Sequence, residues 1–78
     1  HPGETCSSHM ADGLIDFLCS NSEQSNTLLD ALEVRIVPMV NVDGVMYGNS
    51  RCDISGSDIN RQWQFPNRNL YPTVAACK

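Results

Sequence analysis

The amino-acid sequence predicts an α/β fold in which a buried strand lies in a sheet with helices on both sides, and it predicts that the fold is incomplete within this chain. Apolar residues recur at helical spacing in the first third of the chain, and a nearly continuous β-branched run follows at residues 34–40. A chain of 78 residues buries only about 60% of its unfolded surface when it folds. The free energy gained by burying apolar surface then roughly balances the conformational entropy lost on folding. A disulfide, a metal, a partner or more chain is therefore needed for stability.

Two helices are predicted in the first half of the chain and a third near its end. Leu14, Phe17 and neighbouring apolar residues repeat at helical spacing, which predicts a helix over residues 8–20 with Leu14 and Phe17 facing inward. A group of leucines predicts a shorter helix over residues 25–33, with Ser and Asn residues available as caps. Pro72 is typical of a first helical position, so a helix is expected to start there.

Residues 34–40 are predicted to form a strand that is buried on both faces, because β-branched residues dominate the run. The chain offers no second convincing strand, so the other strands of the sheet are expected from outside it. A hairpin is the alternative, in which residues 45–47 pair with residues 37–40 across a turn at Asp43 and Gly44.

The charge balance disfavours nucleic acids and membranes as partners. Five Lys and Arg residues against nine Asp and Glu residues give a net charge of −4, which makes a poor surface for phosphates. The most apolar stretch, residues 34–45, contains charged residues and is shorter than the roughly 20 residues of a membrane-spanning helix. The first residues lack the basic and apolar segments of a signal peptide. We therefore expect neither nucleic acid nor membrane as a partner.

The cysteines leave two interpretations of the redox compartment. There is no C-x-x-C pair, which argues against zinc-ribbon and thioredoxin-like sites. The modest cysteine content and the absence of a glycosylation sequon favour a reduced, intracellular protein. A small secreted domain stapled by disulfides is the alternative, in which the four cysteines pair in an order that the sequence leaves open. These cysteines are Cys6, Cys19, Cys52 and Cys77.

The first residues of the chain hold two side chains of the kinds that bind zinc. His1 and Glu4 form an H-x-x-E pattern, which combines an imidazole and a carboxylate. The pattern is short, and a surface His beside a helix-capping Glu is the common alternative. His9 is a further candidate ligand, although an exposed position in the first turn of a helix explains it as well.

A second group of polar residues follows the predicted strand in a Gly-rich loop. The group contains Arg51, Asn60 and Arg61. In α/β proteins, ligand-binding residues gather beyond the carboxyl ends of the strands. Arg and Asn side chains are donors that suit a carboxylate ligand. The alternative is that these side chains only form hydrogen bonds with carbonyl groups of the loop.

The chain contains, in order, the motifs HPGE, IVPMVNVDGV, GNSRC and GSDINRQWQFP, followed by YPT and a closing Lys. Together these motifs resemble the zinc metallocarboxypeptidases, most closely the cytosolic carboxypeptidase subgroup, and they extend over essentially the whole chain. The chain departs from the subgroup pattern at four positions. Val42 stands where Pro is usual, Ile59 replaces Leu, Tyr71 stands where His is common, and His9 stands where an aromatic residue is frequent.

The resemblance implies a metallocarboxypeptidase-type fold, a mixed sheet flanked by helices, with residues 1–78 forming part of the catalytic domain. It implies Zn2+ as the cofactor, with His1 and Glu4 as two of the three protein ligands and Asp58 as the carboxylate that orients His1. The third ligand, a His, the general base, a Glu, and a substrate-capping Tyr would lie beyond Lys78. The chain is therefore expected to be an internal segment of the domain and to be inactive by itself.

The resemblance also implies how the substrate is bound. Arg51 would have a catalytic role, in which it polarises the scissile carbonyl and stabilises the developing oxyanion. Asn60 and Arg61 would bind the terminal carboxylate of the substrate. The resemblance implies a cytoplasmic enzyme that removes C-terminal residues, glutamate in this subgroup, from polypeptides such as tubulin tails. The alternative is an inactive carboxypeptidase-like module that binds acidic C-terminal tails.

Overall fold

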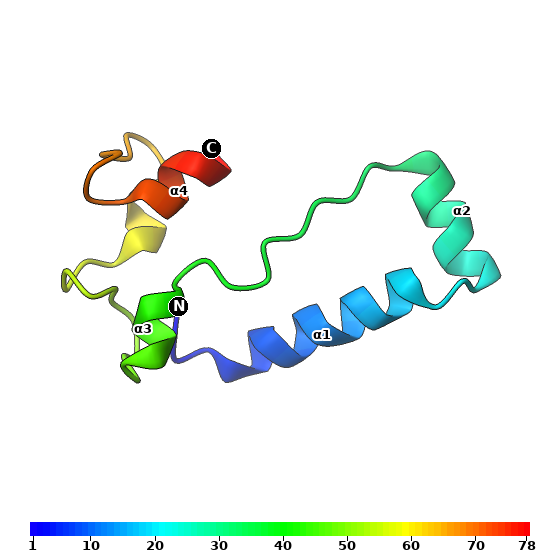
Figure 1. Ribbon diagram of the computed structural model, residues 1–78, viewed down its shortest axis with the longest axis horizontal. Helices are drawn as coiled ribbons and strands as arrows, with labels where there is room; N and C mark the ends of the chain where they lie inside the picture. Colours follow the sequence, from blue (N-terminus) through cyan, green and yellow to red (C-terminus); the bar gives the residue numbers. More distant parts are fainter. The chain divides into compact units, whose positions relative to one another are not determined.

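The structure, a computed structural model, describes all of residues 1–78. Its elements are α1 (Thr5–Cys19), α2 (Glu23–Ala31), α3 (Val42–Met46), the 3₁₀-helix η1 (Ile59–Arg61) and α4 (Pro72–Cys77), as Figure 1 shows. The chain divides into two compact units. We call Cys6–Pro38 the helical unit, and His1–Thr5 together with Met39–Lys78 the loop-rich unit.

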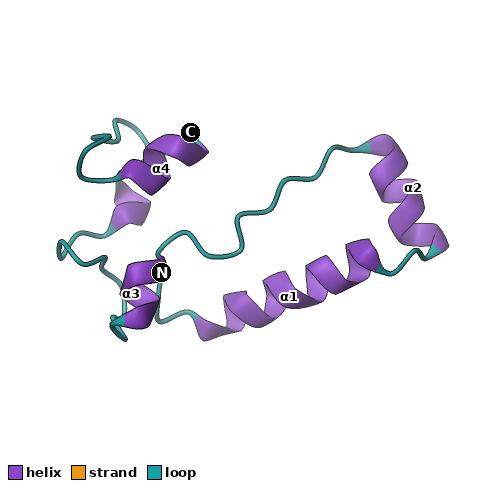
Figure 2. Cartoon of the chain, viewed as in Figure 1, coloured by secondary structure: helices purple, strands orange, loops and turns teal.

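The predicted mixed sheet is absent, so the fold class expected from the sequence is wrong. No residue of the chain forms a strand, as Figure 2 shows. The β-branched run at residues 34–40 is a loop between α2 and α3, with 37% of Val34 and 56% of Val37 exposed. A strand needs a neighbouring strand that pairs with its backbone N–H and C=O groups, and the chain supplies none. The apolar pattern alone does not create the sheet.

The alternative hairpin is also wrong, because Val42–Met46 forms α3. Asn41 caps this helix: its Oδ1 accepts a hydrogen bond from the backbone N–H of Gly44 at 3.0 Å. An Asn at the N-cap satisfies an N–H group that has no partner within the helix. The cap explains why Asp43 and Gly44 lie inside a helical turn and not at the tip of a hairpin.

The predicted helices form close to their expected positions. α1 replaces the helix expected at residues 8–20 and starts earlier, at Thr5. α2 also starts earlier than expected because Ser22 caps it, with its hydroxyl accepting from the N–H of Ser25 at 3.2 Å. The expected helix start at Pro72 is confirmed. None of these helices has the length and hydropathy that a membrane crossing requires.

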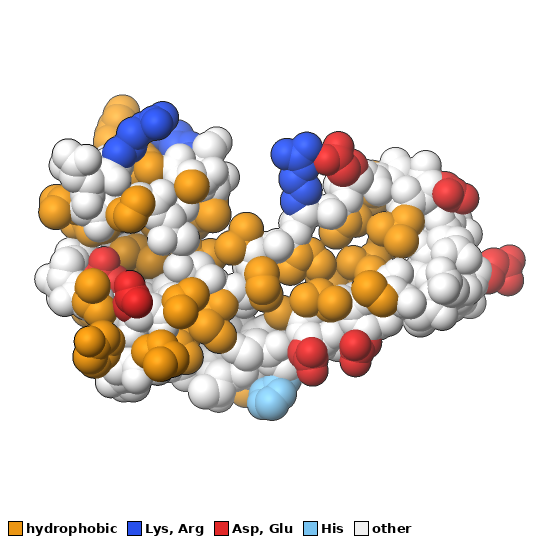
Figure 3. Space-filling view, viewed as in Figure 1, with side chains coloured by type: hydrophobic (Ala, Val, Ile, Leu, Met, Phe, Trp, Pro, Cys, Tyr) orange, Lys and Arg blue, Asp and Glu red, His pale blue; other side chains and the backbone are white.

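The inward orientation predicted for Leu14 and Phe17 is wrong. Leu14 is 46% exposed and Phe17 is 41% exposed, and no residue of α1 is buried. Their apolar stripe was expected to pack against a sheet, and no sheet forms. Many hydrophobic side chains consequently lie at the surface, as the orange atoms of Figure 3 show. Val74 in α4 is the one buried hydrophobic residue, so the chain has almost no core of its own.

A backbone contact at Gly3 joins the first residues of the chain to the loop around Ser50. The Gly3 N–H donates to the carbonyl oxygen of Ser50 at 2.9 Å. A Cβ at position 3 would lie 2.7 Å from that oxygen, a distance that real Cβ atoms essentially never show. Glycine is therefore required for this close approach, which places His1 and Glu4 near the loop that carries Arg51.

The turn at residues 53–57 leads into η1 and is organised by Asp53. Its Oδ1 accepts from the N–H of Ser55 at 2.9 Å, from the N–H of Ser57 at 3.0 Å and from the Ser55 hydroxyl at 2.6 Å. Burial raises the pKa of Asp53, but these hydrogen bonds lower it by more, so the pKa lies below its ordinary value of 3.8. The Ser57 hydroxyl also lies 3.2 Å from the hydroxyl of Tyr71, which ties the turn to the residue before α4.

We predict that this turn loosens in acid. A carboxyl group with a lowered pKa in the folded state stabilises that state above the unfolded pKa, and the contribution is lost as the pH falls through the folded pKa. An NMR titration is expected to place the pKa of Asp53 below 3.8, with the amide shifts of Ser55 and Ser57 following the same curve. In Asp53→Asn these amide shifts should no longer change over that range. A pKa of Asp53 at or above its ordinary value would contradict this account of the turn.

Candidate functional site

The residues predicted to act in catalysis or binding all lie in the loop-rich unit, and Asp58 is at their centre. Its Oδ1 accepts from Nε2 of His1 at 3.1 Å and from the backbone N–H of Asn60 at 3.0 Å. Its Oδ2 accepts from Nε of Arg51 at 2.6 Å, and Nε of Arg61 lies 3.8 Å from the same oxygen. Only 18% of the Asp58 side chain is exposed, and this partial burial strengthens its charge-assisted contacts.

The local sequence explains why Asp58 occupies this position. It follows the turn at residues 53–57 and is the N-cap of η1, where its side chain accepts from the N–H of Asn60. A short, tight 3₁₀ turn follows, which keeps Asn60 and Arg61 close to the capping carboxylate. Three of the predicted site residues are thus gathered by one local element, whereas His1 and Arg51 come from other parts of the chain.

The ring of His1 lies between two carboxylates. Its Nε2 faces Asp58, and its Nδ1 lies 3.0 Å from Oε1 of Glu4. A neutral imidazole that donates from Nε2 has only a lone pair at Nδ1, so a proton or a metal ion is needed between Nδ1 and Glu4. Two ligand atoms on a tetrahedral zinc ion, with bonds of about 2.0–2.1 Å, lie roughly 3.3 Å apart. The 3.0 Å between Nδ1 and Oε1 is a hydrogen-bond or ion-pair distance, and it is close to the spacing of two ligand atoms on one zinc ion.

The residues of the chain do not complete a metal site. No group of three or more His, Cys, Asp and Glu side chains is arranged to hold a metal ion. A catalytic zinc ion takes three protein ligands, and His1 with Glu4 provides two of them. His9, the other candidate ligand, lies in the helical unit. Zinc chemistry therefore needs a ligand from outside these residues.

Arg51 and Arg61 place two guanidinium groups around the carboxylate of Asp58. The Arg51 side chain is 50% exposed and the Arg61 side chain is 65% exposed. Asp58 accepts from Nε of Arg51, and a guanidinium group carries further N–H donors in a planar fork. That fork matches the geometry of carboxylates and oxyanions. The arrangement can therefore bind an anionic group at the protein surface.

Sequence reasoning missed one contact of this cluster, which joins Asn60 to Trp63. The indole Nε1–H of Trp63 donates to Oδ1 of Asn60 at 2.8 Å. Trp63 lies beyond the end of η1, and neither the motifs nor the apolar pattern of the sequence indicates the contact. The bond uses the amide oxygen of Asn60 and leaves its NH₂ group as a donor.

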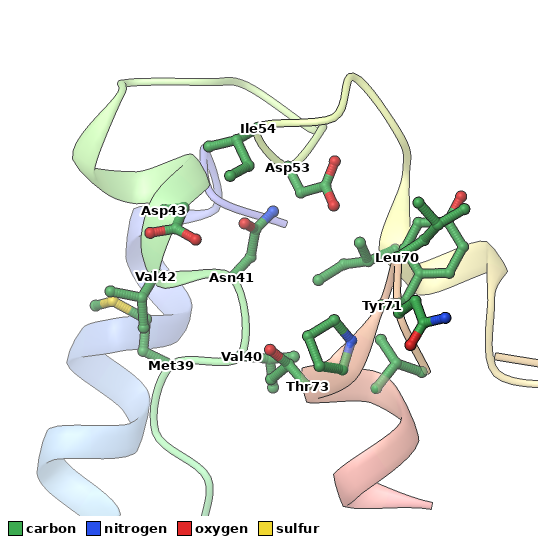
Figure 4. A pocket seen from close by; sticks show the side chains of 14 residues that line it. Met39, Val40, Asn41, Val42, Asp43, Asp53, Ile54, Leu70, Tyr71 and Thr73 are labelled. Carbon is green, nitrogen blue, oxygen red and sulfur yellow. The ribbon is translucent and has the colours of Figure 1, made fainter. Parts of the chain in front are cut away.

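A cavity of about 350 Å³ lies in the same unit, and none of the predicted site residues lines it. Its walls come from residues 39–43, from the turn beginning at Asp53 and from residues 69–74, as Figure 4 shows. Asn41 lines the cavity, and its Nδ2 is buried without a hydrogen-bond partner. A buried donor without a partner costs free energy, so this amide group destabilises the folded unit. The cavity and the predicted site are separate features.

Comparison with known proteins gives consistent matches over the whole chain. Residues 1–77 match the zinc carboxypeptidase family, Peptidase_M14. The chain is 49% identical over 78 residues to cytosolic carboxypeptidase 1 of Mus musculus, covering 100% of this chain and 6% of that protein. It is 50% identical over 78 residues to cytosolic carboxypeptidase 1 of Danio rerio, covering 100% of this chain and 7% of that protein. No solved structure matches the chain significantly.

A more distant relative shows the same pattern. Cytosolic carboxypeptidase 6 of Caenorhabditis elegans is 42% identical over 78 residues, which are 100% of this chain and 17% of that protein. The chain therefore spans only a small part of the curated relatives that it matches. The motifs HPGE, GNSRC and GSDINR all lie within the matched residues. Because the family match extends over residues 1–77, the chain belongs to the zinc carboxypeptidase family.

Proposed function

We propose that residues 1–78 form part of the catalytic domain of a zinc-dependent carboxypeptidase, which removes C-terminal residues from polypeptides. Family membership supports the reaction class. The observation that carries the proposal is the cluster around Asp58, which gathers a histidine and two arginines at one carboxylate. The chain spans 6% of its relative from Mus musculus, so the rest of the catalytic machinery is expected elsewhere in the protein.

In this proposal His1 and Glu4 bind the zinc ion together with a ligand from outside residues 1–78. Zinc, when bound, supplies a Lewis acid for the scissile carbonyl and lowers the pKa of a water molecule. Asp58 accepts a hydrogen bond from the Nε2–H group and thereby directs the lone pair of Nδ1 toward the metal position. The 3.0 Å separation of His1 Nδ1 and Glu4 Oε1 supports this assignment.

The remaining residues of the cluster bind the substrate. Arg51 donates to the scissile carbonyl oxygen and to the oxyanion that develops there. Asn60 and Arg61 bind the terminal carboxylate of the polypeptide. Both tasks depend on Asp58, which holds the Arg51 side chain and the Asn60 backbone. A shared anchor suits an exopeptidase, because the terminal carboxylate must lie at a fixed distance from the scissile bond.

We further propose glutamate as the residue removed, acidic tails such as those of tubulin as the substrates, and the cytoplasm as the location. The resemblance to the cytosolic carboxypeptidase subgroup supports all three. The names of the relatives from Mus musculus and Danio rerio also support the location. Two arginines at one surface cluster are suited to attract an acidic polypeptide.

An inactive module that binds acidic C-terminal tails is the second candidate. One observation favours it: the exposed guanidinium groups of Arg51 and Arg61 can bind an acidic tail whether or not the complete protein holds zinc. The two candidates differ in the complete protein. An enzyme holds zinc and releases C-terminal residues, whereas the module binds the same peptides without zinc and without turnover.

Arg61→Lys is expected to lower kcat/KM of the complete enzyme at least about tenfold on a peptide that ends in glutamate. The reason is the loss of a charge-assisted fork, a type of contact that contributes about 1.5–3 kcal/mol. Arg68→Lys is the matched control, because Arg68 is an exposed arginine of the same unit without a role in the proposal. Steady-state kinetics should show no change for the control. Unchanged kinetics for Arg61→Lys would show that Arg61 does not contact the terminal carboxylate.

Zinc binding tests the ligand assignment. His1→Ala in the complete enzyme is expected to remove zinc and activity, because only one ligand of the pair remains. His9→Ala, the matched control, should keep both, as measured by metal analysis of the purified proteins. Retention of zinc by His1→Ala would show that His1 is not a ligand. A wild-type protein that binds glutamate-ending peptides without zinc would support the inactive module instead.

The isolated chain of 78 residues is expected to bind zinc weakly and to release no glutamate from a polyglutamate peptide. It lacks a third ligand, and its zinc position lacks a general base. Calorimetric zinc titration and analysis of released glutamate measure both properties. Submicromolar affinity together with zinc-dependent release would require a further ligand among the residues of the chain.

A further inference from the structure

The contact between Trp63 and Asn60 determines which way the amide of Asn60 points. The indole Nε1–H lies 2.8 Å from Oδ1 of Asn60. An indole can only donate, so the atom that faces it must be the amide oxygen and not the NH₂ group. The NH₂ group is therefore directed away from the ring of Trp63. Neither the sequence motifs nor the roles proposed above assign a function to Trp63.

The backbone of Asn60 is fixed independently of its side chain. Its N–H donates to Oδ1 of Asp58 at 3.0 Å, at the start of η1. Trp63 is 40% exposed, so part of its ring is covered while the N–H is used by Asn60. One bond thus holds the main chain of Asn60, and another holds its amide. Without the second bond the amide can turn about a broad, roughly two-fold torsion.

We propose that Trp63 is a positioning residue, which holds the amide of Asn60 so that its NH₂ group donates to the terminal carboxylate of the substrate. This inference rests on the proposed function, in which Asn60 and Arg61 bind that carboxylate. The opposite orientation of the amide would place its oxygen against the carboxylate, where two acceptors repel each other. Trp63 therefore acts on substrate binding through Asn60, without touching the substrate.

Trp63→Phe in the complete enzyme tests the inference, because it keeps an aromatic ring and removes the N–H. KM for a peptide that ends in glutamate is expected to rise about three- to tenfold, the range of one ordinary hydrogen bond. The value of kcat is expected to change less than about twofold, since the scissile bond and the zinc ligands are not affected. Tyr47→Phe is the matched control: Tyr47 is an exposed aromatic residue of the same unit, 77% exposed, and the variant also removes one donor.

A double-mutant cycle with Asn60→Ala distinguishes positioning from a general structural role. If Trp63 acts only through Asn60, Trp63→Phe raises KM no further in the Asn60→Ala background. A structural role would instead produce additive effects, and it would lower kcat and the melting temperature as well. Additive effects of that kind overturn the inference.

A second measurement uses two ligands that differ only in the terminal group. Calorimetry compares a glutamate-ending peptide with its C-terminal amide on the wild type and on Trp63→Phe. Only the free carboxylate is expected to lose affinity in the variant. An equal loss for both peptides would contradict a role for Trp63 in reading the carboxylate.

Replacing Trp63 with β-(3-benzothienyl)alanine keeps the bicyclic ring and removes only the N–H, so it tests the bond if Trp63→Phe does not fold. The same rise in KM is expected.

Two outcomes separate the inference from the proposed function. If Asn60→Ala raises KM while the Trp63 variants leave it unchanged, the inference fails and the proposed function stands. If Asn60→Ala and Arg61→Lys both leave KM unchanged, the proposed carboxylate-binding role of these two residues fails, and the inference about Trp63 fails as well.

Discussion

The carboxylate of Asp58 is the constraint on which the candidate site depends. One of its oxygens accepts from the His1 ring and from the Asn60 backbone, and the other accepts from Arg51. Because both oxygens are used, the carboxylate cannot rotate without breaking at least one of these bonds. The side chain that contacts the candidate zinc ligand His1 is thus the same one that contacts Arg51 and Asn60, the candidate substrate-binding residues. A displacement of any partner is transmitted to the others through a single group.

The predicted helices form and the predicted sheet does not, because helices depend on residues that are close in sequence and sheets on residues that are distant in sequence. Helix starts depend on neighbouring residues, so the start at Pro72 was predicted correctly and that of α2 to within two residues, although its cap, Ser22, was not identified. A strand depends on partners that are distant in sequence, and the β-branched run at residues 34–40 has none in this chain. The exposure of Phe17 has the same cause, because the layer expected to cover it does not form. A run of apolar residues indicates that a segment favours burial on both faces, but it does not show that a neighbouring strand is present.

For the site, the sequence supplied the residue types and their order, and the structure supplied the contacts. The resemblance pointed to His1, Arg51 and Asp58, and these three side chains lie together in the loop-rich unit. The contact of Trp63 with Asn60 was not predicted, because the spacing of apolar residues does not indicate which side chains form hydrogen bonds in an exposed turn. The sequence also did not predict that Nδ2 of Asn41 lacks a hydrogen-bond partner, since the helix cap uses only the amide oxygen of this residue.

The close approach of Gly3 to Ser50 bears on how an H-x-x-E pattern should be written. That pattern treats both intervening positions as interchangeable, yet a methyl group at the second would lie 2.7 Å from the carbonyl oxygen of Ser50. A query of the form H-x-G-E, combined with a later loop of the GNSRC type, therefore encodes a steric requirement in three dimensions. Chance pairs of His and Glu that lack the glycine or the loop are then rejected for a physical reason, and a weak motif becomes a discriminating one.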